Sequence, residues 1–198
     1  MNIVLITGSM YAGKSTELIR RLSIYSSMGI KTLYINSSLD TRGEKFSTHN
    51  KTLNSSLGEI DTMKTLKLLD LLNPIFNLMN YQVVGIDEGQ FFPDLLEFVR
   101  ALELICFRLT PEEKQNFTIN IIISGLNGDY NRKPFGDIIN IVPLCDEIVL
   151  LKPFCKICSN NLIPAPFTKK IEGDLTEQID VGGIDKYIPV CRKHYFDL

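Results

Sequence analysis

Residues 3–16 read Ile-Val-Leu-Ile-Thr-Gly-Ser-Met-Tyr-Ala-Gly-Lys-Ser-Thr, and they are the most informative part of the sequence. The apolar run over residues 3–6 predicts a short buried strand, and residues 8–15 match the phosphate-loop pattern G-x-x-x-x-G-K-[ST]. In such a loop a glycine-rich turn opens a helix whose unpaired backbone N–H groups bind an anion. The alternative is a chance match in a flexible loop. The strand before the pattern and the helical periodicity after it favour a nucleoside triphosphate site.

The pattern also predicts roles for the residues of the loop. Lys14 would reach the β- and γ-phosphates of the nucleotide, and the hydroxyl of Ser15 would ligate Mg²⁺. The predicted phosphate-binding set is Gly8, Ser9, Met10, Tyr11, Ala12, Gly13, Lys14, Ser15 and Thr16. The loop predicts a bound triphosphate and leaves open what the phosphate is used for.

A second element of the same site follows the apolar residues 83–86. Asp87 and Glu88 come directly after this expected strand. A phosphate-loop protein needs a carboxylate at the end of a neighbouring strand to help hold Mg²⁺, and Asp87 is predicted to do so directly or through a water molecule. Glu88 would then point toward an acceptor and act as a general base. The alternative is that one of these acids caps the following helix, with Asp94 similarly placed.

The bulk composition limits the class of protein. The chain has 198 residues, 44% of them hydrophobic, a net charge of −2 and a pI of about 5.7. This length suits one α/β domain with a small addition, and the charge provides no global field that would attract nucleic acid. No apolar stretch approaches the roughly 20 residues that span a bilayer. We therefore expect a soluble, cytoplasmic protein with neither a membrane nor a nucleic acid as partner.

Strand and helix patterns alternate along the chain, which is typical of a parallel sheet with crossover helices. The predicted fold class is α/β, a P-loop nucleotide-binding domain with a mostly parallel, RecA-like sheet over residues 1–152, plus a small zinc-binding domain over residues 153–198. Residues 37–58 show little periodicity and are interpreted as a loop. The other predicted elements are strands at 31–36, 63–66, 82–86, 117–124 and 148–152, and helices at 18–28, 68–79, 95–109 and 136–142.

The C-terminal part carries metal-ligand spacing. Cys155 and Cys158 form a C-x-x-C pair, and Cys191 and His194 form a C-x-x-H pair. Thiolate and imidazole ligands at this spacing fit a tetrahedral structural Zn²⁺, which would tie together a segment that lacks its own core. A redox C-x-x-C or simple buried thiols are the alternatives, but both leave the second pair unexplained. The remaining two of the five cysteines, Cys106 and Cys145, lie on apolar stretches and are predicted to be core residues.

Taken in order, these segments resemble one family, the type II thymidine kinases, which are zinc-containing P-loop enzymes of vertebrate cytosol, bacteria and poxviruses. The resemblance covers nearly the whole chain. Its most specific parts are Gly-Ile-Asp-Glu-Gly-Gln-Phe-Phe at 85–92 and Arg-Lys-Pro-Phe-Gly at 132–136. The phosphate loop and the cysteine pairs join them, with further matches at 40–42, 47–49, 126–131 and 182–187.

The resemblance implies transfer of the γ-phosphate of ATP to the 5′-hydroxyl of thymidine, with deoxyuridine as a secondary substrate. It implies Glu88 as catalytic base, Asp87 with Mg²⁺, and Asp40 and Arg42 beside the phosphates. A lasso over residues 168–190, anchored by the zinc, would close over the nucleoside and meet the thymine edge with backbone groups. The implied thymidine-contacting set is Met10, Phe91, Leu126, Tyr130, Phe135, Val181, Gly182, Gly183, Ile184 and Tyr187. A homotetramer and feedback inhibition by thymidine triphosphate are implied as well.

The chain departs from the family pattern in several places. Tyr130 stands where the family often has Phe, and Asp180 precedes the Gly-Gly pair where an apolar residue is usual. The stretch from Cys158 to Thr168 is longer than in many relatives, which leaves the role of Thr168 open. An insertion at 107–116 is expected on the surface and puts the tetramer in question.

Two other functions compete with this interpretation. One is a P-loop kinase that has shifted to another deoxynucleoside. The other is a nucleotide-dependent switch or a zinc-ribbon module that binds nucleic acid. Such a module needs a basic face around the cysteines, whereas the lysines and arginines there are mixed with acidic residues.

Overall fold

The computed structural model describes residues 1–39, 60–73, 78–159, 162–172, 178 and 185–197, and all structural statements below concern these residues. Their centre is a six-stranded sheet in the order β3-β2-β4-β5-β1-β6, in which every neighbouring pair is parallel. The strands are β1 (Asn2–Gly8), β2 (Thr32–Ser37), β3 (Asp61–Thr65), β4 (Val83–Ile86), β5 (Asn120–Leu126) and β6 (Glu147–Leu151). The predicted α/β class with a parallel sheet is confirmed.

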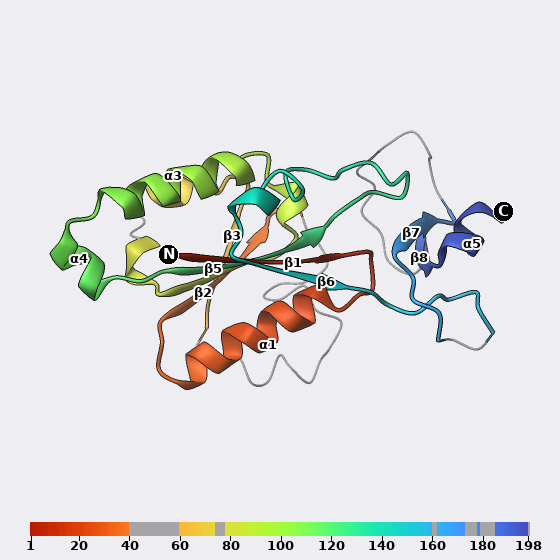
Figure 1. Cartoon of the computed structure of the whole chain (residues 1–198), viewed down its shortest axis with the longest axis horizontal. Coiled ribbons are helices and arrows are strands. Elements are labelled where there is room, and N and C mark those ends of the chain that lie inside the picture. Colours follow the sequence, from red (N-terminus) through yellow and green to blue (C-terminus); the bar gives the residue numbers. More distant parts are fainter. Residues whose placement is uncertain (40–59, 74–77, 160–161, 173–177, 179–184, 198) are drawn as a thin grey trace.

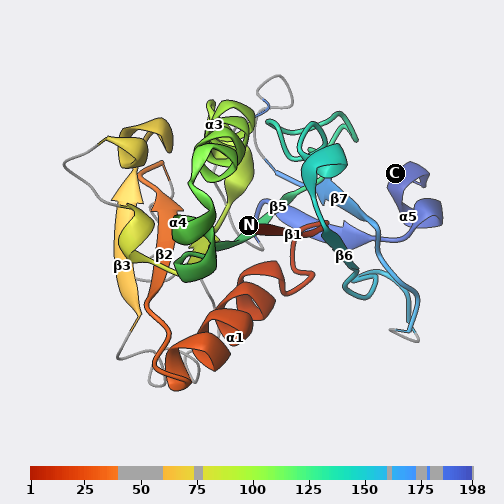
Figure 2. The ribbon, with the colours of Figure 1, turned by 60° about the vertical axis from the view of Figure 1, so that its left-hand side comes forward.

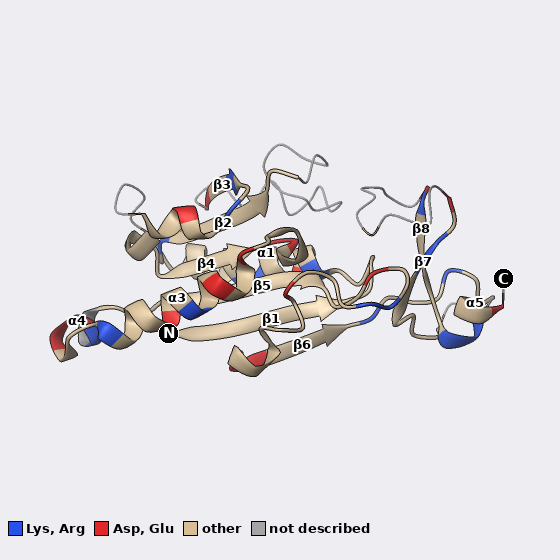
Figure 3. Ribbon diagram, turned by 90° about the horizontal axis from the view of Figure 1, so that it is seen from above, with Lys and Arg blue, Asp and Glu red and all other residues tan. Residues whose placement is uncertain are grey.

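Helices cover both faces of the sheet, α1 (Lys14–Ser27) on one and α3 (Leu95–Arg108) on the other (Figure 1). Alternate side chains of β1 enter the two layers, because successive residues of a strand point to opposite faces. Ile3 and Leu5 pack in the core cluster that contains the buried residues of α3, whereas Val4 and Ile6 pack with those of α1. The inner strands β4 and β5 are apolar for the same reason, and Figure 3 shows no charged residue on β1, β4 or β5.

Two predicted helices are wrong. In place of a helix over 68–79, the structure has the 3-10 turns η1 (Leu69–Leu72) and η2 (Leu78–Asn80), with 74–77 outside the described residues. Asn73 is extended, at φ −66° and ψ 140°, because the following proline disfavours a helical conformation for the residue before it. In place of a helix over 136–142, the chain forms turns that lead to η4 (Val142–Leu144), since Gly136 adopts a left-handed φ of 54°.

The insertion at 107–116 contains a short helix, α4 (Pro111–Asn116). It begins with a capping box, in which Thr110 Oγ1 accepts a hydrogen bond from the backbone N–H of Glu113 and the Glu113 carboxylate accepts one from the backbone N–H of Thr110. Pro111 occupies the first helical position, where its missing N–H costs nothing. Residues 111–114 are exposed, as expected for a surface insertion.

The described residues from 153 onward form what we call the C-terminal module. It contains the antiparallel pair β7 (Phe167–Lys170) and β8 (Tyr187–Val190), followed by α5 (Arg192–Phe196). Figures 1 and 3 show the module beyond the carboxyl ends of β1, β5 and β6, and the turned view of Figure 2 shows it far from β3. Among the described segments, no helix is long and apolar enough to cross a membrane.

Candidate active site and metal centre

The phosphate loop leaves β1 at Gly8 and enters α1 after Gly13, and its geometry requires glycine at both positions. Gly8 has a φ of 147°, and a Cβ there would overlap the carbonyl oxygen of Leu151 on the neighbouring strand β6. Gly13 is the N-cap residue of α1 and has a left-handed φ of 82°. A side chain is strained in that conformation, whereas glycine adopts it freely. The two glycines of the pattern therefore fix how the loop turns from strand to helix.

Lys14 and Ser15 open the helix that follows this turn. Lys14 is buried, and its Nζ donates a 2.9 Å hydrogen bond to the carbonyl oxygen of Ser9 within the same loop. Ser15 Oγ donates at 3.1 Å to Asp87 Oδ1 at the end of β4. The two predicted elements of the phosphate site, the loop and the acid, are thus brought into direct contact.

Asp87 is fully buried and accepts hydrogen bonds on both carboxylate oxygens. Oδ1 accepts from the hydroxyls of Ser15 and Ser124 and from the backbone N–H of Glu88, and Oδ2 accepts at 2.8 Å from the Tyr34 hydroxyl. Burial, together with the neighbouring charge of Glu88, raises the pKa of the Asp87 carboxyl, and the hydroxyl donors oppose that shift. Asp87 therefore joins the loop to strands β2 and β5.

Glu88 follows with a left-handed φ of 51°, a conformation that costs about 1–3 kcal/mol for a residue other than glycine. Such strain gathers at functional sites, and Tyr11 in the phosphate loop shares it with a φ of 65°. The Glu88 carboxylate accepts a 2.6 Å hydrogen bond from Gln90 Nε2. Gln90 Oε1 in turn accepts from the backbone N–H of Leu126 at 3.0 Å. Gln90 thus connects the predicted base to a residue of the thymidine-contacting set.

Four aromatic residues of that set form two pairs. Phe91 and Phe135 are in edge contact, with ring centroids 5.8 Å apart, and Tyr130 and Tyr187 lie 6.3 Å apart. Met10 and Leu126 are half-buried. The other predicted site residues lie outside the described part of the chain: Asp40, Arg42, Val181, Gly182, Gly183 and Ile184.

The turn that carries Tyr130 and Phe135 is organised by Asp129. Asp129 Oδ1 accepts from the backbone N–H groups of Asn131 and Lys133, and Oδ2 accepts at 2.9 Å from Gln178 Nε2. A further bond joins the same turn to α5, where the Tyr195 hydroxyl donates to the Tyr130 carbonyl oxygen at 2.8 Å. The C-terminal module therefore holds this turn at two separate points.

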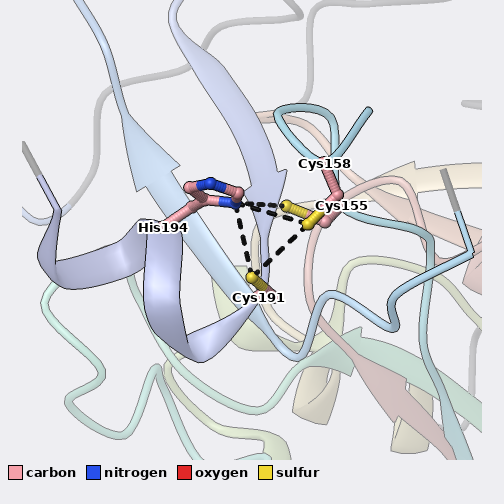
Figure 4. Close-up of side chains that lie close together, drawn as sticks. All are labelled: Cys155, Cys158, Cys191 and His194. Carbon is pink, nitrogen blue, oxygen red and sulfur yellow. Dashed lines mark hydrogen bonds between the residues drawn. The ribbon is translucent and has the colours of Figure 1, made fainter. Parts of the chain in front are cut away.

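The predicted metal ligands are brought together at one point of the module. The sulfur atoms of Cys155, Cys158 and Cys191 and a ring nitrogen of His194 all lie within 4.8 Å of one another (Figure 4). The nitrogen is His194 Nδ1, at 3.4–3.5 Å from each sulfur, and the sulfurs of Cys158 and Cys191 are 3.8 Å apart. A tetrahedral zinc with Zn–S of about 2.3 Å and Zn–N of about 2.0 Å needs edges of about 3.5 and about 3.8 Å. The cluster has the donors and the dimensions that Zn²⁺ takes.

Two cysteines of this cluster differ widely in the pKa of their thiols. Burial raises the pKa of Cys155, but hydrogen bonds from neighbouring backbone N–H groups and from His194 outweigh it and bring the pKa to about 6. Burial and the sulfurs of Cys155 and Cys191 raise the pKa of Cys158 to about 11. Once one of these cysteines is a thiolate, its negative charge opposes ionisation of a second cysteine beside it. A bound metal ion would remove that repulsion. Cys106 and Cys145 lie outside the cluster; both are only half-buried and pack against the core around α3, so the predicted core position is confirmed in part.

Several polar residues of the site were not predicted from the sequence. Tyr34, Gln90 and Ser124 are each buried and hydrogen-bonded to Asp87 or Glu88, and Ser124 also follows an apolar run near a strand end, as Asp87 does. Asp94, considered as a cap for α3, instead accepts from the backbone N–H groups of Leu68 and Leu69. The only sequence signal for Gln90 was its position two residues after the acidic pair.

The fold and the loop define the class of protein: a P-loop nucleotide-binding protein with a Cys₃His cluster in a module at its C-terminal end. Comparison with known proteins gives the family. The family model described as thymidine kinase matches residues 1–195. The thymidine kinase of vaccinia virus (strain Western Reserve) is 39% identical over 197 residues, which are 99% of this chain and 97% of that protein. The chain belongs to the thymidine kinase family, and its activity is that of a thymidine kinase.

A second virus supports the same family assignment. The thymidine kinase of Choristoneura biennis entomopoxvirus is 38% identical over 196 residues, which are 98% of this chain and 96% of that protein. Among solved structures, the flagellar accessory protein FlaH from Methanocaldococcus jannaschii aligns with a TM-score of 0.49 and 13% identity over 79% of this chain and 73% of that chain. That structural similarity is weak, and the fold class stands on the strand order and the loop.

Proposed function

We propose that this chain transfers the γ-phosphate of ATP to the 5′-hydroxyl of thymidine with Glu88 as general base. The observation that carries the assignment is the position of Glu88 between two hydrogen-bonded groups. Its backbone N–H donates to Asp87, which contacts the phosphate loop through Ser15. Its carboxylate accepts from Gln90, which contacts Leu126 on the nucleoside side. A base in that position can accept the hydroxyl proton as the phosphoryl group moves.

On the donor side, we assign the phosphate loop of residues 8–16 to the triphosphate, with Lys14 on the β- and γ-phosphates. The Ser15 hydroxyl would ligate Mg²⁺, which would supply positive charge to offset that of the phosphates. Asp87 already accepts from several protein donors, and this supports a contact with the ion through water rather than direct ligation. From the family resemblance, we also propose that Asp40 and Arg42 lie beside the phosphates of ATP.

On the acceptor side, the two aromatic pairs suit an apolar base and sugar and exclude water from the transfer. We assign Met10, Leu126 and these four aromatic residues to thymidine, with the backbone of 181–184 meeting the thymine edge. The zinc would be structural, because three thiolates and an imidazole complete its coordination. It would hold the domain of residues 153–198 against the kinase domain of residues 1–152.

The decisive experiment replaces Glu88 by Gln. The variant keeps the size of the side chain and its contact with Gln90 but removes the base, so kcat for thymidine should fall by at least ~10²-fold while ATP binding is retained. Glu97→Gln, on the exposed side of α3, is the matched control and should behave as the wild type. Turnover near that of the wild type for Glu88→Gln would show that another group takes the proton.

We propose the range of nucleosides that the enzyme phosphorylates, and its oligomeric state, from the family resemblance. We expect phosphorylation of thymidine first and deoxyuridine second, because backbone groups that match the thymine edge reject that of cytosine. A preference for deoxycytidine in the same assay would overturn the assignment. We also propose a cytoplasmic homotetramer that thymidine triphosphate inhibits. Light scattering and an inhibition assay test these two points.

A further inference from the structure

Two long-range hydrogen bonds join the phosphate loop to the C-terminal module. Ser9 Oγ donates to the carbonyl oxygen of Ala165 at 2.8 Å, and the backbone N–H of Met10 donates to Thr168 Oγ1 at 3.0 Å. Ser9, Ala165 and Thr168 are all buried, at 4%, 0% and 5% exposure. Buried hydrogen bonds between consecutive loop residues and one short segment fix the position of the loop against that segment.

On the loop side, the contact reaches the lysine of the phosphate site. The carbonyl oxygen of Ser9 accepts the 2.9 Å hydrogen bond from Lys14 Nζ, while the hydroxyl of the same residue donates to Ala165. Ser9 therefore lies between the phosphate-binding lysine and the module. A change in the position of Ala165 must alter either the bond from Ser9 or the carbonyl group that holds Lys14.

In the module, Ala165 and Thr168 lie close to the segments that carry the cysteines of the metal cluster. The backbone N–H of Ala165 donates to the Pro153 carbonyl, and that of Cys155 donates to the Ile163 carbonyl, so the segment before β7 pairs with the segment that carries the first two cysteines. Thr168 is the register partner of Pro189, two residues before Cys191. Ala165, Cys155 and Cys191 belong to the same small buried cluster.

We propose that Ser9 and Thr168 are positioning residues through which the metal-bound module holds the phosphate loop in its nucleotide-binding shape. The metal cluster then serves the ATP side of the site as well as the nucleoside side. Ser9 acts through its hydroxyl, which a residue without a donor cannot replace, and Thr168 acts by satisfying the N–H of Met10. The inference rests on the proposed assignment of the loop to ATP.

Two measurements on the zinc-loaded enzyme test the proposal: the affinity for Mg²⁺-ATP, and the rate at which a chelator removes zinc. Ser9→Ala and Thr168→Val should each weaken ATP binding roughly threefold to tenfold, the range for one lost hydrogen bond. Each should also speed zinc loss. Thr168→Ser keeps the acceptor oxygen, so its affinity for Mg²⁺-ATP and its rate of zinc loss should equal those of the wild type. Thr62→Val, exposed on the edge strand β3, is the control and should change neither.

Reciprocity sharpens the test, because coupling between two sites changes the binding free energies of both ligands by the same amount. Zinc affinity, measured by competition with a chelator at equilibrium, is therefore compared beside the rate of zinc loss. Saturating Mg²⁺-ATP should slow zinc loss from the wild type, and this protection should disappear in the Ser9→Ala, Thr168→Val double variant. Unchanged ATP affinity in both single variants, or full protection in the double variant, overturns the proposal. Lys14→Ala separates the underlying assignment: it should lose ATP binding and keep its zinc, and retained ATP binding there would refute the loop assignment instead.

Discussion

The parallel sheet and the C-terminal module are held together by different means. The sheet buries an apolar layer on each face, with Leu5 and Phe98 in one layer and Ile6 and Leu22 in the other. The buried cluster of the module consists of Cys155, Ala165, Val190 and Cys191, of which two are metal-cluster cysteines. The module has a small buried apolar cluster, so we expect a metal ion at the Cys₃His cluster and polar contacts with the sheet domain to supply much of its order.

This difference shows how the two halves of the site are built. Two residues proposed for the donor, Lys14 at the start of α1 and Asp87 directly after β4, lie on elements whose apolar residues pack in the core of the sheet domain. The residues proposed for the acceptor depend on the module, which reaches Tyr130 through Tyr195 and the phosphate loop through Ser9 and Met10. A disturbance of the module should therefore impair thymidine binding first and ATP binding second.

The largest effect is expected from Cys191→Ser. Structural zinc sites of this kind contribute about 10–16 kcal/mol of apparent binding energy in small domains, so losing a ligand should release the ion and the order of β7, β8 and α5. The sheet should stay folded, because its core contains no residue of the cluster. Hydrogen exchange should show protection lost in the module and kept in β1, β4 and β5. Thymidine affinity should fall much more than ATP affinity.

Phe98→Ala is the counterpart on the sheet side. Removing this fully buried ring should cost about 3–5 kcal/mol of unfolding free energy and leave the zinc content unchanged. Loss of protection throughout the sheet in Cys191→Ser, or zinc loss in Phe98→Ala, would show that the two regions do not differ in the way described.

An intermediate effect is expected from Gln178→Glu. The new carboxylate would face Asp129 Oδ2 and the Pro134 carbonyl oxygen, which now accept from the Gln178 amide. The turn with Tyr130 and Phe135 would lose a contact, and KM for thymidine should rise roughly tenfold, with KM for ATP changed far less.

Adding Asp129→Asn to that variant supplies a donor opposite the new carboxylate and should restore KM for thymidine. Gln178→Met removes the hydrogen bond without adding a charge, so its effect should be smaller. An equal rise of both KM values, or no rescue in the double variant, would contradict a role for this contact on the nucleoside side.

The smallest effect concerns the ion pairs of α1. The hydrogen bond from Arg20, with a second from Arg21, lowers the pKa of Glu17 from 4.5 to about 2, although burial opposes the shift. A lowered carboxylate pKa stabilises the fold above pH 4.5, and this contribution is lost as the pH falls to about 2. Glu17→Gln should cost a few tenths to about 1 kcal/mol at pH 7 and almost nothing near pH 2. Urea unfolding at the two pH values measures this, and an equal cost at both would contradict it.

Much of this architecture could be predicted from local sequence. The loop of residues 8–15, the acid pair after β4 and the four metal-cluster residues each follow a short pattern with a direct physical meaning. Strand positions followed from apolar runs in the same way. The loop at 37–58 lies mostly outside the described residues, so that expectation stays a prediction.

What could not be predicted depends on contacts between distant segments. The apolar residues 68–79 suit a helix, but Asn73 is extended before Pro74, and η1 is instead capped by Asp94 from another part of the chain. The contacts of Gln90 with Leu126 and of Thr168 with Met10 leave no periodic trace in the sequence. A side chain that serves a distant backbone group becomes visible only when the fold is known.

The strand order has a consequence for how the protein is made. β1 is synthesised first, yet it lies between β5 and β6, and the N–H of Met10 finds its acceptor 158 positions later. The nascent chain must therefore carry its phosphate loop without these neighbours until almost all of it has left the ribosome. At about 5–20 residues per second this wait lasts for roughly ten to thirty seconds. We therefore expect a chain that terminates before Thr168 to lack the contact that positions its phosphate loop and to phosphorylate no nucleoside.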